Sequence, residues 1–245
     1  MDDWVLFKFT KINKDLLKSL VNSEIYFSLP DDLNDPFDCR VDIARALENA
    51  ILISLSPIRE RLEKFRVMNR FFEKAQADIK EIGVCSFSLK LTEPATTLMW
   101  AHYADNHRGI CLTYGFTKSF FDERADHILG VDEIEYGVNP LSDWFIEKAP
   151  DMKSFDEFGE ALIKKVLTIK AKPWEYEKEV RILRRTHGTE LIEKFYLKQV
   201  CFGLETSEDD IILVRELLDR CGYKVIPCKM IRNTQSDFGF EPVEI

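Results

Sequence analysis

KQVCFGLETSEDDIILVRELLDRCGYKVIPC, residues 198–228, predicts a strand, a helix and a second strand in that order. The apolar run at its start is followed by Ser207, whose hydroxyl can cap the helix formed by the next residues. Gly222 follows the helical pattern and can adopt the left-handed conformation that ends many helices. Residues 223–228 then form the closing strand. Such a strand-helix-strand unit packs on a mixed sheet.

The rest of the chain carries strand and helix patterns without strict alternation. Apolar runs bounded by turn residues predict strands at residues 5–9, 24–30, 84–89, 109–116 and 127–136. Helical spacing predicts helices at residues 13–24, at 41–82 with a break capped by Ser56 and an end at Gly83, at 95–104, and from the Ser154 and Glu157 capping box onward. We therefore predict an α+β fold, a mixed β-sheet core with flanking helices and the C-terminal strand-helix-strand unit, in a single domain over residues 1–245.

The composition limits the classes of partner. The 245 residues carry a formal net charge of −9, so we expect no non-specific binding to nucleic acid. The six cysteines form no C-x-x-C pair, which is typical of small core residues in a reducing compartment. No apolar run approaches the roughly 20 residues of a membrane span, and the start of the chain lacks a signal-peptide pattern. We expect a cytoplasmic protein without membrane contact.

Polar side chains interrupt the predicted strands and turns at four places. The first is Lys8, within the first strand, where a lysine either protects an exposed sheet edge or faces a ligand. In the second, Tyr26 and Ser28 share a strand face, and Asn34 and Asp35 follow in a turn. Local backbone hydrogen bonds explain such a turn, but strand-end hydroxyls beside it also form a pocket rim.

The third place, residues 98–109, is dense in aromatic and polar groups, among them Trp100, His102 and Tyr103. These side chains either bind and stack on a ligand or form a core tryptophan beside a hydrogen-bonded histidine. His107 lies five residues after His102, which misses the spacing of one helix face, so no metal site is predicted here.

The fourth place is KAKPWEYEKEVRIL, residues 170–183. As one extended strand it would place Glu175, Glu177, Glu179 and Arg181 on a single face. These carboxylates either form the solvated side of a half-buried strand or converge on a ligand. We favour Glu179 facing the ligand with Arg181 orienting it, and Glu175 and Glu177 solvated or supporting it. The segment also contains two candidate phosphate contacts and a candidate stacking platform, namely Lys170, Lys172 and Trp174.

The order of these stretches resembles an uncharacterised bacterial family, domain of unknown function 2971. The resemblance rests on LFKF, IYFSLPDDLNDPFD, MWAHYADNHRGICLTY, KPWEYEKEVRI and VCFGLETSEDD, and it extends over nearly the whole chain. The NDPF turn, the W-x-H-Y stretch and the W-x-Y-E-x-E-x-R stretch are specific in combination. Because that family has no assigned activity, the resemblance implies a fold but no mechanism.

More distantly, the arrangement is similar to the ADP-ribosyltransferase superfamily, whose sites combine a polar or basic residue, a hydroxyl or aromatic residue and a glutamate on successive strands. The similarity implies an ADP-ribosyltransferase-like fold in which Lys8, then Tyr26 or Ser28, then Glu179 or Glu177 take these places. NAD is the implied substrate, because a glutamate below the ribose stabilises the charge that develops as nicotinamide leaves. Lys8 departs from the usual arginine or histidine and binds phosphate only as a point charge.

The candidate catalytic residues are therefore Glu179, Glu177, Tyr26 and Ser28, and the candidate nucleotide-binding residues are Lys8, Asn34, Asp35, Trp100, His102, Tyr103, Lys172, Trp174 and Arg181. Three functions remain open. The first is an NAD-dependent ADP-ribosyltransferase or NAD-cleaving toxin in phage defence, with an unknown acceptor and a neutralising protein partner. The second is a non-catalytic nucleotide-binding or regulatory module, which Lys8 favours slightly. The third is metal-dependent phosphodiester cleavage by Asp35, Asp38, Glu177 and Glu179, with Lys172 nearby.

Overall fold

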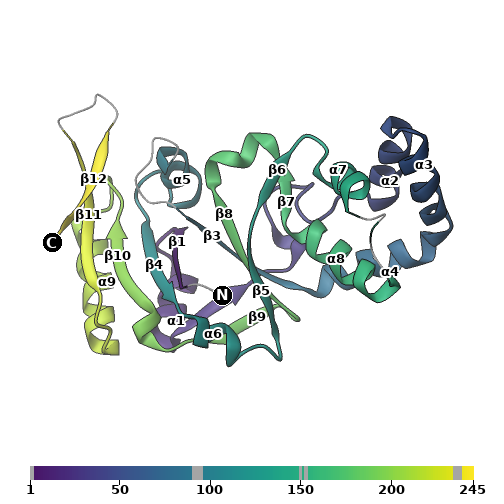
Figure 1. The fold of residues 1–245 in the computed structure, drawn as a ribbon. Helices are drawn as coiled ribbons and strands as arrows, with labels where there is room; N and C mark the ends of the chain where they lie inside the picture. Colours follow the sequence, from purple (N-terminus) through teal and green to yellow (C-terminus); the bar gives the residue numbers. More distant parts are fainter. Residues whose placement is uncertain (1–2, 90–95, 149–150, 152–153, 234–238) are drawn as a thin grey trace.

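The computed structural model of the protein describes residues 3–89, 96–148, 151, 154–233 and 239–245. In these residues a mixed eight-stranded sheet has the strand order β12-β11-β10-β4-β1-β3-β8-β5 (Figure 1). Its strands are β1 (Trp4–Thr10), β3 (Gly83–Ser88), β4 (Ile110–Phe116), β5 (Ile128–Glu133), β8 (Glu179–Arg184), β10 (Leu197–Phe202), β11 (Ile226–Arg232) and β12 (Phe240–Glu244). Two small sheets pair β2 (Glu24–Phe27) with β9 (Gly188–Leu191) and β6 (Glu135–Gly137) with β7 (Ile169–Ala171). The predicted α+β class and mixed sheet are confirmed.

The C-terminal strand-helix-strand unit forms as predicted. β10 and β11 run parallel, and α9 (Glu208–Cys221) connects them. The Ser207 side chain accepts a hydrogen bond from the Asp210 backbone N–H, and Gly222 ends the helix with φ of 75°. The second strand begins at Ile226 rather than at residue 223, because Tyr223 packs into the core and its hydroxyl donates to the Leu20 carbonyl.

Replacing Ser207 by alanine should lower the free energy of unfolding by about 1 kcal/mol, because an N-terminal N–H of α9 loses its acceptor. Urea denaturation of the purified protein measures the change. Ser207→Asp is the matched control, since an aspartate restores the cap and should recover the stability of the wild type. Equal losses in both variants would contradict a capping role.

β1 lies inside the sheet, between β4 and β3, so the interpretation of Lys8 as an edge lysine is wrong. The strand is followed by α1 (Lys14–Asn22), whose N-cap is Asn13, as the sequence predicts. β1 pairs along its whole length with β4 but meets β3 at one register pair, Phe7 with Ser88. β1 and β3 are therefore paired over a short stretch only. The polar side chains of the candidate site lie beside these two strands.

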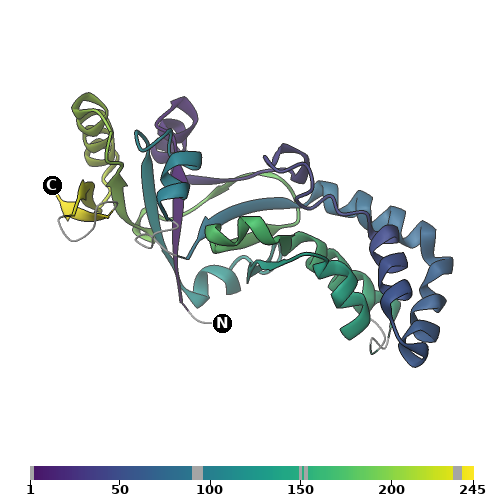
Figure 2. The same cartoon turned by 90° about the horizontal axis from the view of Figure 1, so that it is seen from above.

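Within the described residues, five helices pack together at one end of the sheet (Figure 2). They are α2 (Ile43–Ile53), α3 (Ser56–Glu63), α4 (Asn69–Glu81), α7 (Pro140–Glu147) and α8 (Phe155–Leu167). Their core includes Val84 of β3 and Leu183 of β8, so this end is continuous with the sheet. The predicted cap at Ser56 is shifted, because Leu55 is the N-cap and Ser56 is the first residue of α3. Gly83 starts β3 instead of ending α4.

The structure describes four further α-helices and four 3-10 turns. They are α1, α5 (Thr96–Tyr103), α6 (Lys118–Asp122), α9 and the 3-10 turns η1 (Pro30–Asp32), η2 (Lys64–Met68), η4 (Lys172–Glu177) and η5 (Lys194–Tyr196). The predicted helix at residues 95–104 corresponds to α5, with residue 95 outside the described residues. None of the helices that the structure describes is both long and apolar enough to cross a membrane.

Residues 170–183 do not form the single extended strand that alternation predicts. They contain the end of β7, the 3-10 turn η4 and the start of β8. Pro173 sits at the beginning of η4, where its missing N–H costs nothing, and Lys178 leaves the turn in the left-handed region at φ of 45°. The predicted strand at residues 127–136 is likewise divided into β5 and β6, which belong to different sheets. These interruptions of the predicted strands determine which polar side chains lie close together in the structure.

Candidate functional site

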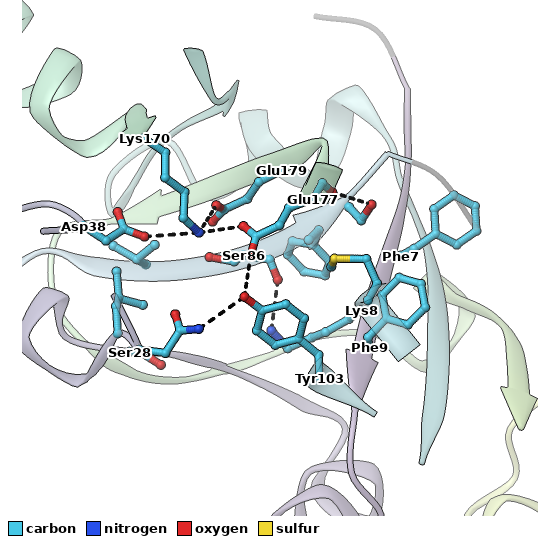
Figure 3. Close-up of a pocket in the computed structure, with 16 residues that line it drawn as sticks. Phe7, Lys8, Phe9, Ser28, Asp38, Ser86, Tyr103, Lys170, Glu177 and Glu179 are labelled. Atoms are coloured by element: carbon cyan, nitrogen blue, oxygen red, sulfur yellow. Dashed lines mark hydrogen bonds and ion pairs between the residues drawn. The ribbon is translucent and has the colours of Figure 1, made fainter. Parts of the chain in front are cut away.

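A cavity of about 200 Å³ is lined by residues of β1, β3, α5 and η4, among other segments, and Figure 3 shows its lining side chains. Its charged and polar lining comes from segments far apart in the sequence: Lys8, Ser28, Asn34, Asp38, Ser86, Ser88, Tyr103, Lys170, Glu177 and Glu179. Its apolar lining includes Phe7, Phe9, Phe87 and Met99. The cavity therefore combines ionisable groups with an aromatic wall, which is the usual character of a ligand site.

Lys170 is the central cation of the site. Its Nζ lies 2.6 Å from Glu177 Oε2, 3.1 Å from Glu179 Oε2 and 3.4 Å from Asp38 Oδ2 (Figure 3). All four side chains are almost completely buried, with at most 4% of each side chain exposed. Burial would lower the pKa of Lys170, but the three carboxylates raise it above its usual value. Lys170 therefore stays charged and holds the carboxylates together.

Arg181 supports the site from behind. Its guanidinium is fully buried and binds both oxygens of Glu179, with Nε 2.7 Å from Oε1 and NH2 3.2 Å from Oε2. NH2 also lies 2.6 Å from Asp38 Oδ2, and NH1 donates to the Leu167 carbonyl at 2.9 Å. Because the guanidinium is planar, its hydrogen bonds hold the carboxylates of Glu179 and Asp38 in one orientation. This arrangement agrees with the predicted orienting role of Arg181, which remains a prediction.

The pKa values of Glu177 and Glu179 are shifted in opposite directions, although both carboxylates form ion pairs with Lys170. For Glu179, burial raises the pKa, but Arg181 and Lys170 overcome it and bring the pKa from 4.5 to about 2. For Glu177, burial raises the pKa above its usual value, and the charge of Glu179 adds to the rise while Lys170 opposes it. Glu179 is therefore the stronger acid of the pair and stays an anion, and Glu177 is the carboxyl group that takes up a proton more readily.

Tyr103 connects Glu177 to the front of the cavity. Its hydroxyl donates to Glu177 Oε1, and it accepts a hydrogen bond of 3.2 Å from the Asn34 side-chain amide (Figure 3). Burial and the charge of Glu177 raise the pKa of Tyr103, so its hydroxyl stays protonated. Ser88 donates to the Glu177 carbonyl at 2.8 Å and fixes the backbone that presents the carboxyl group.

Lys8 is the second cation that lines the cavity. Its Nζ donates to the Ser86 carbonyl at 3.1 Å and lies 5.2 Å from the centre of the Phe87 ring. Nζ also donates to Cys85 Sγ at 3.7 Å, so of the three N–H groups of the ammonium one is left for an anionic ligand. The predicted ligand-facing placement of Lys8 is compatible with this geometry.

Six predicted site residues meet at the cavity: Lys8, Ser28, Asn34, Tyr103, Glu177 and Glu179. The other predicted residues do not line it. Tyr26 is 47% exposed on β2, and Trp100 is a fully buried core side chain packed edge-on against Phe9. His102 pairs with Tyr176 at 3.0 Å, and Lys172 forms an exposed ion pair with Glu175.

Interactions within the protein account for two further residues that were predicted to bind the nucleotide. Asp35 accepts a hydrogen bond from the Phe37 backbone N–H at 2.9 Å, which is the local turn interaction weighed from the sequence. Trp174 lies outside the cavity lining, with Lys170 Nζ 5.0 Å from its ring centre, so it covers the buried ammonium from the other side. Glu175 is half-exposed between two lysines, as expected for a solvated carboxylate.

Sequence reasoning selected Lys172 and missed the central place of Lys170. An available signal was that Lys170 directly follows an apolar run; in the structure it is the second residue of β7, next to the buried Ile169. Asp38 was considered only as a metal ligand, although its carboxylate pairs with Arg181 across 143 positions of sequence. Ser86 had no signal at all, since it lies in an otherwise ordinary buried strand.

The metal-site interpretation has little geometric support. Among the described residues, no group of three or more His, Cys, Asp or Glu side chains is arranged to hold a metal ion. Asp38, Glu177 and Glu179 do approach one another, but the ammonium of Lys170 lies between them. Asp35, the fourth predicted ligand, is turned to a backbone N–H instead.

Part of this site lies in a segment that is similar to a known family. Residues 99–182 match the family described as "Protein of unknown function (DUF2971)", which confirms the resemblance over that segment. The match includes Tyr103, Lys170, Glu177, Glu179 and Arg181, whereas the stretches that carry Lys8 and Asn34 lie outside it. Searches of the curated proteins and of the solved structures found no match to this chain. The similarity to ADP-ribosyltransferases therefore remains a prediction.

Proposed function

We propose that the cavity binds the nicotinamide-ribose end of NAD and that the protein is an ADP-ribosyltransferase or NAD-cleaving enzyme. The observation that carries the proposal is the pair Glu177 and Glu179, two carboxyl groups in one cavity whose environments shift the pKa in opposite directions. Such a division typically separates a permanently charged group from one that transfers a proton.

The chemistry divides between the two glutamates. As the bond between ribose C1′ and the nicotinamide nitrogen breaks, the electron pair leaves with nicotinamide and positive charge develops on the ribose. The anion of Glu179, which stays charged down to about pH 2, stabilises that charge. An acceptor hydroxyl or water then attacks C1′ and gives its proton to Glu177, whose raised pKa makes it the stronger base.

The rest of the lining suits the same ligand. Lys8 can contact the pyrophosphate as a point charge, and the aromatic wall beside it can stack on the nicotinamide ring. A volume of about 200 Å³ is smaller than the roughly 300 Å³ at which pockets enclose a drug-sized ligand. The cavity would therefore enclose the nicotinamide-ribose part and leave the adenosine part outside. Loss of cellular NAD would make the protein a cytoplasmic toxin or phage-defence effector, controlled by a neutralising protein partner.

One observation favours a second candidate, a non-catalytic nucleotide-binding module. Both oxygens of Glu179 are already occupied by Arg181 and Lys170, and Lys170 also binds Glu177. A carboxylate held so fully by its own protein has less capacity to interact with a ribose. In that case the ion cluster would stabilise the pocket, and the nucleotide would be bound unchanged.

The test is release of nicotinamide from NAD by the purified protein, with and without cell lysate as a source of acceptor. Glu179→Gln keeps the side-chain shape and should reduce the rate about 10²- to 10³-fold, because the charge that stabilises the transition state is lost. Glu177→Gln should reduce it by about 10²-fold or more through the loss of a base. Glu175→Gln is the matched control, since Glu175 is half-exposed and outside the cavity lining, and it should keep the wild-type rate.

Each outcome has a defined meaning, provided that circular dichroism shows the variants to be folded. No release by the wild type under either condition, combined with binding of intact NAD, selects the nucleotide-binding module. Equal rates for the variants at positions 175 and 179 would remove the special role of Glu179.

A further inference from the structure

The turn at residues 34–37 separates the first cavity from a second one that the proposed reaction does not use. Asn34 lines the first cavity, whereas Asp35 and Phe37 line a neighbouring cavity of about 390 Å³. Asp38 and Lys170 line both, so their ion pair forms part of the wall between them. A volume of this size lies in the range of about 300–1,000 Å³ that small-molecule sites occupy.

Two arginines that line the second cavity keep unused donors. The NH2 group of Arg40 donates to the carbonyls of Leu33 and Asp35 at 3.2 and 2.8 Å, but its Nε is buried and has no partner in the part of the chain that the structure describes. This Nε has no surface open to the cavity, so a ligand there would meet Arg40 through the charge of its guanidinium and not through Nε. For Arg45, whose side chain is exposed on the first turn of α2, the described residues provide no ion pair or hydrogen bond to the guanidinium.

The acidic residues of the second cavity are already satisfied by the protein. Asp35 binds the Phe37 backbone N–H, and Asp38 binds Arg181 and Lys170. Asp42 caps α2 by accepting a hydrogen bond from the Arg45 backbone N–H at 2.9 Å. The exposed guanidinium of Arg45, for which the described residues provide no partner, together with the charge of Arg40, therefore favours an anionic ligand.

The apolar part of the lining indicates what else the ligand carries. Phe37 is 73% exposed and Val138 is 86% exposed, and Pro140 of α7 lines the same cavity. An exposed phenylalanine beside two guanidinium groups offers a ring face for stacking next to charge for a phosphate.

We propose that the second cavity is a binding site for a nucleoside phosphate, with Arg40 and Arg45 binding the phosphate and Phe37 stacking on the base. The site is separate from the one proposed for NAD cleavage. Because Asp38 and Lys170 line both cavities, a ligand in the second acts on the same ion cluster that positions Glu177 and Glu179.

Binding of AMP to the full-length protein, measured by isothermal titration calorimetry, tests the proposal, with inorganic phosphate and adenosine as separate probes. Arg45→Gln should weaken AMP binding about 10-fold or more, which corresponds to the loss of one charged contact. Arg61→Gln is the matched control, because Arg61 is an exposed arginine of the same helical region outside the cavity, and it should bind AMP like the wild type. Arg40→Lys is the second variant and should also weaken binding, since lysine keeps the charge but lacks the planar guanidinium that pairs with phosphate.

Tyr103→Phe distinguishes the two cavities, because Tyr103 lines the first and not the second, and AMP binding should persist in it. The proposal is overturned if the wild type binds no AMP, if the variants at positions 45 and 61 bind it equally, or if Tyr103→Phe alone abolishes binding. Adenosine binding as tightly as AMP would equally overturn the phosphate contact. None of these measurements uses nicotinamide release, so failure of the NAD proposal leaves them interpretable.

Discussion

Replacing Arg181 by methionine should lower the free energy of unfolding by about 3–5 kcal/mol, the cost of removing one partner from a buried charge cluster. Methionine fills a similar volume, so the loss reports charge rather than a cavity. The wild-type guanidinium is fully buried and compensates Asp38 and Glu179, which are also buried. In the variant Lys170 would be the single cation facing three carboxylates, counting Glu177.

Urea denaturation monitored by tryptophan fluorescence measures this loss. Arg61→Met is the control, because Arg61 is 60% exposed and pairs with Asp151 at 3.5 Å, so its removal should change stability by less than about 0.5 kcal/mol. A loss of under about 1 kcal/mol for Arg181→Met would mean that water or protonation compensates the carboxylates, and it would contradict the cluster as described.

The second large effect is the pH dependence of stability that Glu179 contributes. Its pKa in the folded protein is lowered from 4.5 to about 2, so the folded state favours the charged form. The resulting stabilisation is complete above about pH 4.5 and disappears as the pH falls toward 2. The size follows from 4.5 − 2 = 2.5 pKa units, or about 3 kcal/mol at 1.36 kcal/mol per unit.

Urea denaturation between pH 7 and pH 2 should show this loss in the wild type, and Glu179→Gln should lack it. The difference in stability between the two proteins should therefore shrink as the pH falls. Glu177 acts in the opposite sense, because its raised pKa favours the protonated form in the folded protein, so a parallel series with Glu177→Gln separates the two contributions. A wild-type minus Glu179→Gln difference that stays constant with pH would show that Glu179 has no lowered pKa.

The elements that the sequence predicted well are those decided by local interactions. Asn13, Ser154 and Ser207 cap their helices because each side chain reaches the backbone N–H three residues ahead. The alternation of side chains along a strand also placed Ile110 and Phe116 on one buried face of β4. A shift of the strand by one residue would turn these side chains away from the core, so the register is fixed. In both cases the information lies within a few residues.

The segment at residues 170–183 shows where this local information ends. A strict period of two favours one strand, but Pro173 begins a 3-10 turn and Lys178 adopts a left-handed conformation that only the folded surroundings stabilise. As a result Glu177 and Glu179 meet on Lys170, while Glu175 is directed toward solvent. The alternation pattern identified all of these side chains, but it did not predict the 3-10 turn that separates Glu175 from Glu177 and Glu179.

Trp100 illustrates the same limit for the site. An aromatic residue beside polar groups can line a pocket or fill a core, and the choice depends on the strand that α5 packs against. Phe9 of β1 covers Trp100, whereas Tyr103, one helical turn later, reaches the cavity. Lys8 was informative for a related reason, because a lysine in an interior strand needs a polar partner such as the Ser86 carbonyl.

The location of β1 inside the sheet governs how the chain reaches its structure. Its neighbours are β4 and β3, so Lys8 pairs with Leu112 and Phe7 with Ser88. On the ribosome the first strand must wait for about a hundred residues of chain before both neighbours exist, and β4 must in turn wait for β10, which is made about 80 residues later. Pairing between such distant strands slows folding and prolongs the exposure of apolar strand edges. Newly made chains should therefore depend on chaperones more than a protein whose strands pair in order.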